Sequence, residues 1–437
     1  MIRPLDAAYA ALLGVTSPVW GFPLLRTGKW RTDWKGRRGF APSIPPDPRP
    51  TVLLHGVSVG EVVAAEPLVR HLASEGVRVV ISSTTNTGIA RARALFEPDH
   101  EVVRFPLDFS WMVSRFLDRI RPDAVALLEL EVWPHFTREC EARGIPVSVV
   151  NGRLSASSFR GYHRLRQLLA PSFRRLAAVG AQSDTYAERF VRMDVPPDRV
   201  EVTGTMKWDV ELPDDLAARA RALRADMGIP ADRPVVVAIS TGPDEEAQLV
   251  EATPEGVTLV VVPRKPERFE EVARLADWIR RSEHRGEVGP SARHATDPLD
   301  VPSGAPARAS LPERPARDGP FLIDTMGEAE VATALADVVV VGRTFDGLGG
   351  SNPIPAAALG KPIVSGPDHH NFAEVTEALA PAIRILGDLS DLPAVFGATD
   401  ELARMAEAGP RIVTREQGAT GRNAAIVRRM LSSRTPR

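Results

Sequence analysis

Residues 51–66 read TVLLHGVSVGEVVAAE and combine a strand, a turn and the start of a helix. The apolar run at the beginning ends in a turn with two glycines, and residues 61–65 continue as a helix-forming sequence. A glycine-containing turn between a strand and a helix usually presents backbone N–H groups to a phosphate. Here the carboxylate of Glu61 stands where that anion would dock. The turn therefore favours another task, for which proton abstraction is the candidate.

The alternation of strand-like and helix-like segments continues along the chain. Short runs rich in β-branched residues are separated by amphipathic stretches such as residues 62–76 and 111–122. This pattern predicts an α/β protein with right-handed βαβ units and parallel sheets in two doubly wound halves. Two such halves facing each other would leave a cleft at the carboxyl ends of their strands, where these folds bind ligands. The strand-like runs include residues 77–83, 123–129, 145–151, 178–183, 200–204, 235–240, 257–262, 320–324, 336–342 and 361–366.

The same pattern divides the chain into five predicted parts. These are a membrane-proximal segment (1–40), a first Rossmann-like domain (41–210), a linker helix (211–233), a second Rossmann-like domain (234–410) and a C-terminal helix (411–437). Within the second domain, residues 286–320 are dense in proline, alanine, arginine and glycine and lack apolar periodicity. We predict that they form a mobile surface loop without chemistry.

Composition excludes several classes of protein. The chain has 437 residues, of which 43% are hydrophobic and 25% charged, as in soluble globular proteins. Its formal net charge of -2 gives no global electrostatic case for nucleic-acid binding. The single cysteine, Cys140, excludes an internal disulfide and a cysteine-based zinc site.

The N-terminus indicates contact with a membrane. Residues 7–25 carry no charged side chain and approach the length of a membrane span, but Pro18 and Pro23 interrupt them. The strongly basic residues 26–38 follow, with two tryptophans. Apolar, tryptophan and cationic residues in this order suit a shallow anchor of residues 7–38 on an anionic membrane surface. The alternative is an N-terminal helix packed on the core, followed by a solvated basic loop.

Glu61 is the candidate catalytic base. At the start of a helix, the positive end of the helix dipole stabilises an ionised carboxylate. Such a carboxylate accepts a proton from a substrate that lies within hydrogen-bond reach. The alternative is structural, because acidic residues are favoured in the first turn of any helix.

A second acidic group follows the strand-like run at residues 123–129. Glu129, Glu131 and Trp133 stand at its carboxyl end, where two acids and an aromatic ring suit a hydroxyl-bearing ligand. Salt bridges to Arg138 or Arg143 and a packed Trp133 are the alternative.

The second half contains candidate phosphate-binding residues. Arg264 and Lys265 directly follow a strand-like run, and cations there bind phosphate or carboxylate. Residues 323–338 have the pattern of a strand, a turn and a helix that opens at Glu328, and residues 347–352 form a glycine-rich loop. A base in the first half and phosphate binders in the second fit group transfer from a nucleotide donor.

Three motifs of competing chemistries are absent from the sequence. It has no GxxxxGK[ST] loop, no HExxH and no Asp-x-Asp pair that would hold a divalent metal on a sugar nucleotide. A transferase that uses neither a metal nor a cofactor is therefore favoured. In it, Arg264, Lys207 and helix N-termini would neutralise the leaving phosphate.

Taken together, the motifs resemble those of the 3-deoxy-D-manno-octulosonic acid (Kdo) transferases, which are inverting glycosyltransferases of the two-Rossmann GT-B architecture. The resemblance runs in order over residues 50–380. It is carried by HGVSVGEV (55–62), SSTTNTGIARARALF (82–96), FPLDF (105–109), LELEVWP (128–134), VNGRLSASSFRGY (150–162), AQSDTYAERF (181–190), VTGTMKWD (202–209), PRKPERF (263–269), DTMGEAE (324–330), GGSNPIPAAALGKP (349–362) and NFAEV (371–375).

The resemblance implies transfer of Kdo from CMP-Kdo to a lipid A precursor in lipopolysaccharide biosynthesis, at the cytoplasmic face of an inner membrane. Glu61 aligns with the general base of the family. On the acceptor side the implied residues are Ser58, Gly60 and Thr84, with Glu129 and Glu131 near them. The implied donor-binding residues are Lys207, Ser240, Thr241, Arg264, Met326, Gly327, Glu328 and Asn352.

The chain departs from the family pattern mainly on the donor side. Near Asn352 the family resembles G-G-H-N-x-x-E-P-A, in which the glutamate is expected to hold the nucleotide ribose. Here Pro355 occupies the position of that glutamate, so the donor is held differently or differs in identity. The other departures are Ser351 and Gly242 in place of histidine, Lys265 in place of histidine, Arg343 in place of glycine and Thr205 in place of asparagine.

Three other functions remain open at this stage. One is a related GT-B transferase with another nucleotide-sugar donor, and a second is a nucleotide-sugar 2-epimerase, which has no need of residues 7–38 as an anchor. The third is a membrane-associated paralogue without catalytic activity. Pro355 supports the paralogue, whereas intact Glu61, Arg264 and Gly327 argue against it.

Overall fold

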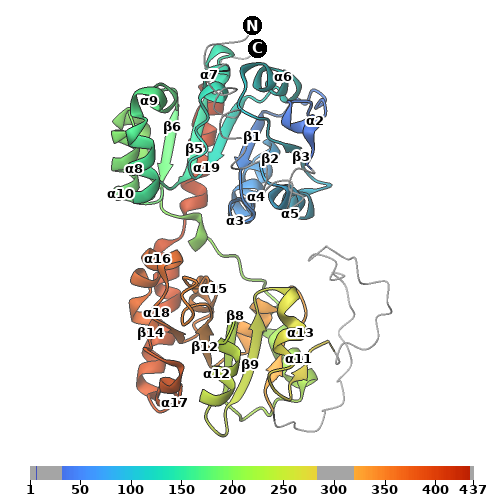
Figure 1. Ribbon diagram of the computed structural model, residues 1–437, viewed down its shortest axis with the longest axis vertical. Coiled ribbons are helices and arrows are strands. Elements are labelled where there is room, and N and C mark those ends of the chain that lie inside the picture. The colour runs from blue at the N-terminus through green and yellow to red at the C-terminus, as the bar shows by residue number, and fades with distance from the viewer. Residues whose placement is uncertain (1–5, 7–31, 283–318, 434–437) are drawn as a thin grey trace, which may run out of the picture. The chain divides into compact units, whose positions relative to one another are not determined.

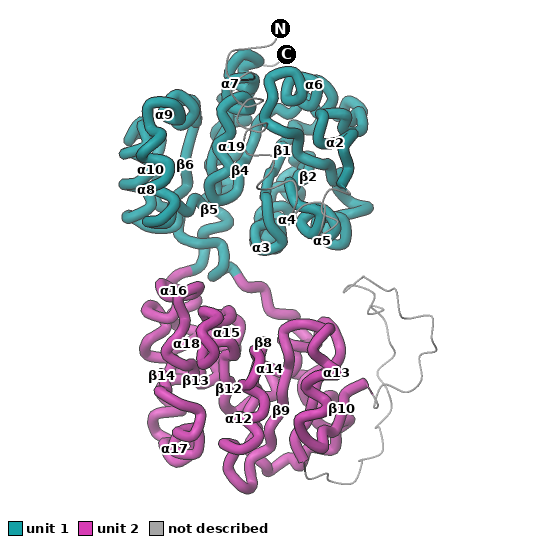
Figure 2. The backbone as a smooth tube through the Cα atoms, in the orientation of Figure 1, with its two compact units in different colours: residues 1–209, 417–437 teal, residues 210–416 magenta. Residues whose placement is uncertain are grey.

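The computed structural model describes Asp6 and residues 32–282 and 319–433. The apolar part of the predicted membrane anchor and almost all of the predicted mobile loop at 286–320 therefore lie outside the described residues. The described chain forms two compact units. The first runs to Asp209 and resumes at Gln417, and the second comprises residues 210–416 (Figure 2).

The first unit is built on a parallel sheet of seven strands, whose apolar β-branched sequences are buried on both faces, as expected for α/β proteins. Val52 and Leu54 of β1 pack on one face of the sheet, and Leu53 packs on the other. In spatial order the strands are β3 (Glu101–Arg104), β2 (Arg78–Ser83), β1 (Thr51–Gly56), β4 (Ala124–Leu128), β5 (Val147–Gly152), β6 (Ala178–Ala181) and β7 (Val200–Val202).

Helices cover both faces of this sheet (Figure 1). The last of them comes from the end of the chain: α19 (Ala419–Ser432) packs against α4 and strands β4 to β6. The other helices are α2 (Trp34–Arg37), α3 (Val59–Ala64), α4 (Glu66–Ser74), α5 (Asn86–Phe96), α6 (Ser110–Ile120), α7 (Pro134–Ala142), α8 (Ala156–Arg164), α9 (Arg166–Arg174), α10 (Asp184–Arg192) and the short 3-10 turns η1 (Pro197–Arg199) and η2 (Met206–Trp208).

The second unit repeats the plan with another parallel sheet of seven strands. Its central strands β8, β9 and β12 are almost entirely valine, isoleucine, leucine and alanine, and their side chains are buried. In spatial order the strands are β10 (Ile279–Arg280), β11 (Phe321–Leu322), β9 (Thr258–Pro263), β8 (Val235–Thr241), β12 (Val338–Val341), β13 (Ile363–Ser365) and β14 (Ile383–Ile385).

The helical segment expected over 211–233 is present as α11 (Leu216–Met227), which packs on α14 within the second unit. The region expected to hold one C-terminal helix contains the end of α18 (Thr399–Glu416) in the second unit and α19 in the first. The remaining helices are α12 (Glu245–Ala252), α13 (Phe269–Val272), α14 (Ala329–Leu335), α15 (Ile354–Ala358), α16 (Ala373–Ala378), α17 (Leu392–Phe396) and the 3-10 turns η3 (Pro266–Arg268), η5 (His370–Phe372), η6 (Ala380–Ala382) and η7 (Leu389–Asp391).

Each sheet has a topological switch point, where the chain reverses the direction in which it adds strands. In the first sheet this point lies between β1 and β4, and in the second between β8 and β12. Open parallel sheets bind ligands beside the carboxyl ends of the strands at such points. The two candidate sites below occupy these positions.

Within the described ranges, none of the helices combines the length and the apolar character that a bilayer crossing demands.

Candidate functional sites

The turn after β1 is held by Glu61 itself. Ser58 is the N-cap of α3, and the two residues form a capping box. The Glu61 Oε2 atom accepts a hydrogen bond from the Val57 N–H at 2.8 Å. The Oε1 atom accepts from the Ser58 N–H at 3.2 Å and from the Ser58 Oγ–H at 2.7 Å. Glu61 therefore has the structural role of stabilising the start of α3, although these hydrogen bonds do not occupy every acceptor position of its carboxylate.

One acceptor position of Glu61 remains open. A carboxylate offers about four lone-pair sites, and these three hydrogen bonds fill both sites on Oε1 and one on Oε2. Glu61 is only partly buried, and it forms no ion pair within the part of the chain that the structure describes. The remaining site on Oε2 can accept a hydrogen bond from a hydroxyl group of a ligand.

Glu129 and Glu131 join Glu61 at the switch point of the first sheet. Both follow β4, the strand beside β1, and Glu129 adopts a left-handed φ of 58°. Burial and the charge of Glu61 raise the pKa of Glu129, against the opposing charges of Arg153 and Lys207. Burial and the charges of Glu61 and Glu129 raise the pKa of Glu131 to about 7, although the Trp133 indole N–H donates to it at 2.9 Å. Three carboxylates thus share one site.

The alternatives weighed for this acidic group are not realised in the described residues. Arg143 pairs with Glu139 at 2.6 Å and with Asp118 at 3.1 Å, and neither Arg138 nor Arg143 pairs with Glu131. Trp133 is 38% exposed, so it is not packed in the core as the alternative required. Lys207, expected among the donor-binding residues, belongs to the first unit and interacts electrostatically with Glu129.

His55 is a member of this site that the sequence analysis did not single out. It is the penultimate residue of β1, fully buried, and its ring stacks on Phe105 at a centroid distance of 3.7 Å. Burial lowers the pKa of His55 to about 3, so the imidazole is neutral. Its Nδ1 lies 3.0 Å from the Ser82 Oγ, and its Nε2 lies 3.5 Å from the Thr84 Oγ1. The position of this ring at the end of β1, next to the glycine turn, was the available signal.

The predicted acceptor-side residues Gly60 and Thr84 also lie at this edge of the sheet. Gly60 is exposed in the first turn of α3. The Thr84 carbonyl oxygen accepts hydrogen bonds from Arg37 at 3.0 Å and from Arg104 at 2.8 Å. Two arginine side chains thereby fix the loop that follows β2.

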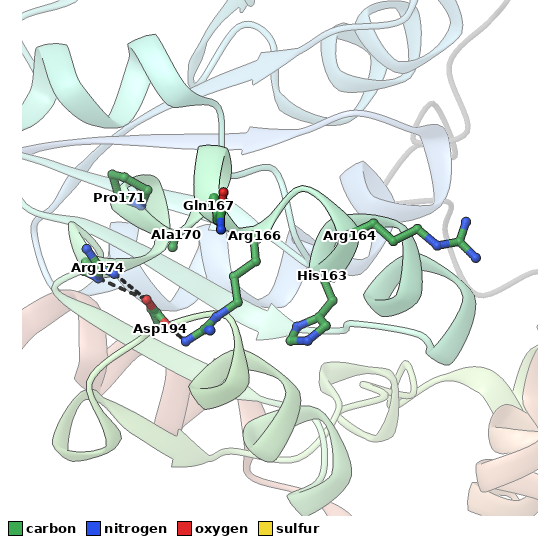
Figure 3. A pocket seen from close by; sticks show the side chains of 8 residues that line it. All are labelled: His163, Arg164, Arg166, Gln167, Ala170, Pro171, Arg174 and Asp194. Atoms are coloured by element: carbon green, nitrogen blue, oxygen red, sulfur yellow. Dashed lines mark hydrogen bonds and ion pairs between the residues drawn. The ribbon is translucent and has the colours of Figure 1, made fainter.

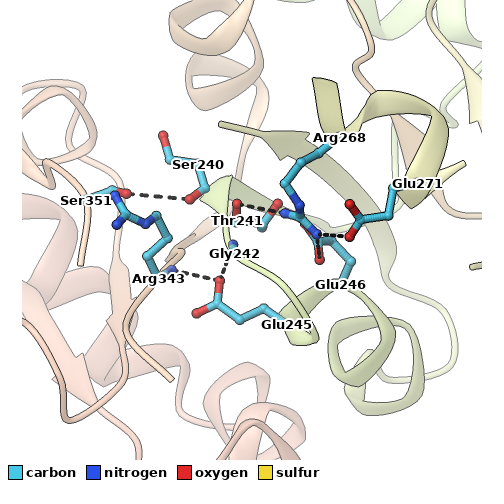
Figure 4. A network of polar contacts seen from close by, with 9 residues as sticks. All are labelled: Ser240, Thr241, Gly242, Glu245, Glu246, Arg268, Glu271, Arg343 and Ser351. Carbon is cyan, nitrogen blue, oxygen red and sulfur yellow. Dashed lines mark hydrogen bonds and ion pairs between the residues drawn. The ribbon is translucent and has the colours of Figure 1, made fainter. Parts of the chain in front are cut away.

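The second site is organised by Glu245, which the sequence analysis also missed. This residue opens α12 after β8 and is 1% exposed. Its Oε2 atom accepts from the N–H groups of Gly242 at 2.8 Å and Arg343 at 2.7 Å (Figure 4). Its Oε1 atom accepts from the N–H groups of Thr344 at 3.0 Å and Phe345 at 3.1 Å. One carboxylate therefore joins the turn after β8 to the loop after β12.

The predicted donor-binding residues Ser240 and Thr241 end β8 beside this carboxylate. Ser240 adopts a left-handed φ of 55°, and its carbonyl oxygen accepts a hydrogen bond from the Ser351 Oγ at 3.5 Å. The Thr241 carbonyl oxygen accepts from Arg268 at 3.2 Å, and Arg268 in turn pairs with the fully buried Glu246 at 2.6 Å (Figure 4). The strand end is thus fixed from both sides.

The other predicted donor-binding residues also follow strand ends of the second sheet. Arg264 follows β9, and its charge interacts with that of Arg343 after β12. Met326 is 64% exposed, Gly327 has a φ of 81°, and the buried Glu328 accepts hydrogen bonds from Arg281 and Thr325.

Asn352 lies two positions before the first residue of α15, Ile354, and its side-chain oxygen accepts from the Ile354 N–H at 3.1 Å. Pro355 is the second residue of α15, so no carboxylate is available at that position.

A separate polar hollow of about 550 Å³ lies on the first unit, between α8, α9 and Asp194, which stands two positions after the end of α10 (Figure 3). Asp194 pairs there with Arg166 and, at 2.6 Å, with Arg174. The sequence analysis did not predict this hollow.

The fold defines a class of protein. Two parallel seven-stranded α/β sheets, each with polar residues at its switch point, form a GT-B-like fold. UDP-GlcNAc 2-epimerase from Neisseria meningitidis has this fold, with a TM-score of 0.53, 13% identity and coverage of 88% of this chain and 100% of that chain. MurG from Acinetobacter baumannii gives a TM-score of 0.51, 15% identity and coverage of 87% and 100%. At these identities the likeness shows the fold alone.

The sequence comparisons identify the family within that class. Residues 32–210 match the family of the 3-deoxy-D-manno-octulosonic-acid transferases (kdotransferases). A 3-deoxy-D-manno-octulosonic acid transferase from Bordetella pertussis is 34% identical over 83% of this chain and 83% of its own length. One from Haemophilus influenzae is 27% identical over 96% and 94%. The chain belongs to the Kdo transferase family of glycosyltransferases, as the resemblance indicated.

Proposed function

We propose that this protein transfers Kdo from CMP-Kdo to a hydroxyl group of a lipid A precursor, with inversion at the sugar carbon and with Glu61 as the general base. The observation that carries the proposal is the cluster of three carboxylates, Glu61, Glu129 and Glu131, at the first switch point in a chain of the Kdo transferase family. In this reaction Glu61 removes the proton of the acceptor hydroxyl while the hydroxyl oxygen forms a bond to the anomeric carbon of Kdo. The bond between that carbon and the CMP phosphate breaks, and CMP leaves with the electron pair.

The local geometry of Glu61 suits this role. The Val57 and Ser58 donors hold the Glu61 carboxylate in one orientation. The free acceptor site on Oε2 is available to the incoming hydroxyl. Glu131, whose pKa is about 7, is able to take up the proton after transfer.

Replacing Glu61 with glutamine tests the proposal. Glutamine also closes a capping box, so the fold is expected to survive, while the base is lost. The full-length protein is incubated with CMP-Kdo and a tetra-acylated lipid A precursor, and products are measured by mass spectrometry. We expect Glu61→Gln to lower turnover by about 10²-fold or more with CMP binding retained. A variant within tenfold of the wild-type rate would assign the base to another residue. Glu66→Gln, on the neighbouring α4, is the matched control and is expected to keep full activity.

On the donor side, we propose that arginine side chains stabilise the leaving CMP phosphate without a metal ion. Arg264 follows β9 beside the switch point, and cationic donors suit a phosphate oxygen. Turnover is then expected to persist in EDTA. A complete loss of activity that added Mg²⁺ restores would contradict this part of the proposal.

The missing carboxylate at Pro355 favours one further candidate, which is transfer from another nucleotide-linked sugar. Substrate competition separates the two candidates. If UDP or UMP inhibits transfer from CMP-Kdo more strongly than CMP does, the donor differs from the one proposed.

We further propose that the protein acts at the cytoplasmic face of the inner membrane, through residues 7–38 and an adjoining surface of the first unit. Trp34, Phe40 and Trp111 are 47%, 44% and 40% exposed. The Arg115 guanidinium lies over the rings of Phe40 and Trp111, at 3.9 Å and 5.3 Å from their centroids. Exposed aromatic rings next to arginines suit the headgroup region of an anionic membrane. We call these four residues the aromatic–arginine surface.

A further inference from the structure

Arg343 is held at the switch point of the second sheet in a conformation that arginine rarely adopts. It follows β12 and has a left-handed φ of 64°. In that region a residue with a Cβ atom is strained, whereas glycine is not. The Glu245 carboxylate accepts the Arg343 N–H at 2.7 Å and so fixes this backbone (Figure 4). Strain of this kind persists where the surrounding structure over-determines it, and it concentrates at ligand sites.

The packing partner of Arg343 is Gly242, in the turn after β8. A Cβ atom on Gly242 would lie 1.9 Å from the Asp346 Oδ2 and 3.2 Å from the Arg343 Cγ. A side chain on Gly242 would therefore displace the Asp346 carboxylate, on the loop that also carries Arg343.

In the part of the chain that the structure describes, Arg343 and Arg264 are two cations without an acidic partner. Within the described residues neither guanidinium forms an ion pair, and the only hydrogen bond of the Arg343 side chain goes to the Leu348 carbonyl oxygen at 3.3 Å. Desolvation and the charge of Arg343 both lower the pKa of Arg264. Mutual repulsion of this kind is relieved when an anion binds between the two groups. Their strands, β9 and β12, flank β8, at whose end the buried Thr241 Oγ1 has no hydrogen-bond partner.

We propose that Arg343 and Arg264 together bind the phosphate of the nucleotide donor. Arg343 is then the reason that this chain binds a nucleotide more tightly than the corresponding nucleoside. The inference rests on the nucleotide donor of the proposed function. Asp346, whose carboxylate lies against Gly242, borders the site and opposes the binding of an anion.

Calorimetric titration of the full-length protein tests the role of Arg343. The probes are CMP and cytidine, which differ only in the phosphate, together with UMP and UDP. We expect Arg343→Gly to weaken CMP binding by about tenfold or more, because a charge-assisted contact is lost. Cytidine affinity is expected to stay unchanged, and thermal stability is expected not to fall, since glycine relieves the strain at this φ. Asp346→Asn is expected to tighten CMP binding, a change of sign that a purely structural role for the loop does not produce.

Arg411→Ala is the control for this experiment. It removes an exposed arginine of α18 that pairs with Glu407, and it is expected to leave CMP binding unchanged. If Arg343→Gly binds CMP within twofold of the wild type, or weakens cytidine equally, the inference is wrong while the proposed function stands. If the wild type prefers UMP or UDP to CMP and Arg343→Gly weakens that ligand, the CMP donor is wrong while the inference stands. Binding of no nucleotide overturns both.

Discussion

Glu61 and Glu245 show how one residue type serves two purposes at equivalent positions. Each lies in the first turn of the helix that follows the first central strand at a switch point. Glu245 is buried and receives four backbone N–H groups, so its acceptor sites are full. Glu61 is partly exposed and receives three hydrogen bonds. Because its acceptor positions are all occupied, Glu245 has a structural role. Glu61 keeps one acceptor position that a ligand hydroxyl can reach.

Glu131 makes the stability of the first unit depend on pH. Its pKa of about 7 exceeds the ordinary value for glutamate, so between about pH 4.5 and 7 the folded protein binds more protons than the unfolded chain. The contribution of Glu131 therefore becomes more unfavourable as pH rises through this window. Glu131→Gln removes it, so the variant is expected to gain about 1–3 kcal/mol relative to wild type between pH 5 and pH 8. Chemical denaturation at the two pH values measures this gain.

Glu141→Gln is the matched control for this prediction. Glu141 is an exposed acid at the end of α7 that pairs with Arg175 at 2.7 Å, and its variant is expected to follow the wild-type pH profile. Parallel profiles for wild type and Glu131→Gln would show that the Glu131 side chain ionises as in the unfolded chain.

Sequence alone predicted Glu61, Glu129 and Glu131 as site residues because each follows an apolar run at a strand end. The resemblance also placed Glu129 and Glu131 near the acceptor-side residues, but the order of strands, which decides which loops are neighbours, comes from the structure. The sequence analysis passed over Glu245, although an acid after a strand and a turn was the same signal that selected Glu61. Its partners Thr344 and Phe345 stand about one hundred positions away in the chain, and only the β8–β12 pairing brings them together.

At the scale of elements, β8 and β12 are joined at their carboxyl ends by the Glu245 carboxylate. Glu245→Gln puts an amide NH₂ against two backbone N–H groups, whichever way the amide is turned, because each carboxylate oxygen accepts two of them. We expect a loss of about 2–4 kcal/mol in the free energy of unfolding of the second unit. Differential scanning calorimetry of the full-length protein measures it.

Glu251→Gln, an exposed change on the same helix α12, is the control and is expected to leave the unfolding transition in place. A Glu245→Gln transition within about 1 °C of wild type would mean that the two loops hold their conformation without the carboxylate.

The alternation of apolar runs and amphipathic stretches predicted the two parallel sheets, because buried strands and their covering helices require different periodicities. The return of α19 to the first unit was beyond this reasoning. The amphipathic sequence of α19 does not indicate which of the two sheets this helix covers. The buried Asn423 of α19 matches the first sheet. The Asn423 side-chain oxygen accepts the Asn151 N–H at 3.0 Å, and the Asn423 amide donates to the Thr203 Oγ1 at 3.2 Å. Such a polar match between distant segments has no local sequence signature.

At the scale of the whole molecule, the proposed function requires an enzyme that meets a lipid acceptor. The aromatic–arginine surface adjoins α2, because Arg115 also donates to the Arg38 carbonyl oxygen at 3.3 Å. It therefore lies next to Arg38, in the described part of the basic segment that was assigned to the membrane from the sequence. Asp6, which is buried and accepts the Ser110 N–H at 2.8 Å, ties the start of the chain to the first residue of α6, next to Trp111.

Vesicle binding by the full-length protein tests this surface. Trp111→Ser with Arg115→Ser removes one aromatic ring and one cation, and each cation near an anionic surface contributes about 1 kcal/mol. We expect at least about fivefold weaker binding to vesicles that contain phosphatidylglycerol, and little change with phosphatidylcholine alone. Leu165→Ser is the matched control: this leucine is 57% exposed between α8 and α9, two helices whose residues line the hollow of Figure 3, and its loss is expected to have no effect. The reverse result, in which Leu165→Ser alone weakens binding, would move the membrane contact to the α8–α9 surface. That surface would then have to bring the Glu61 site to the acceptor, and the exposed aromatic rings near α2 would need another partner.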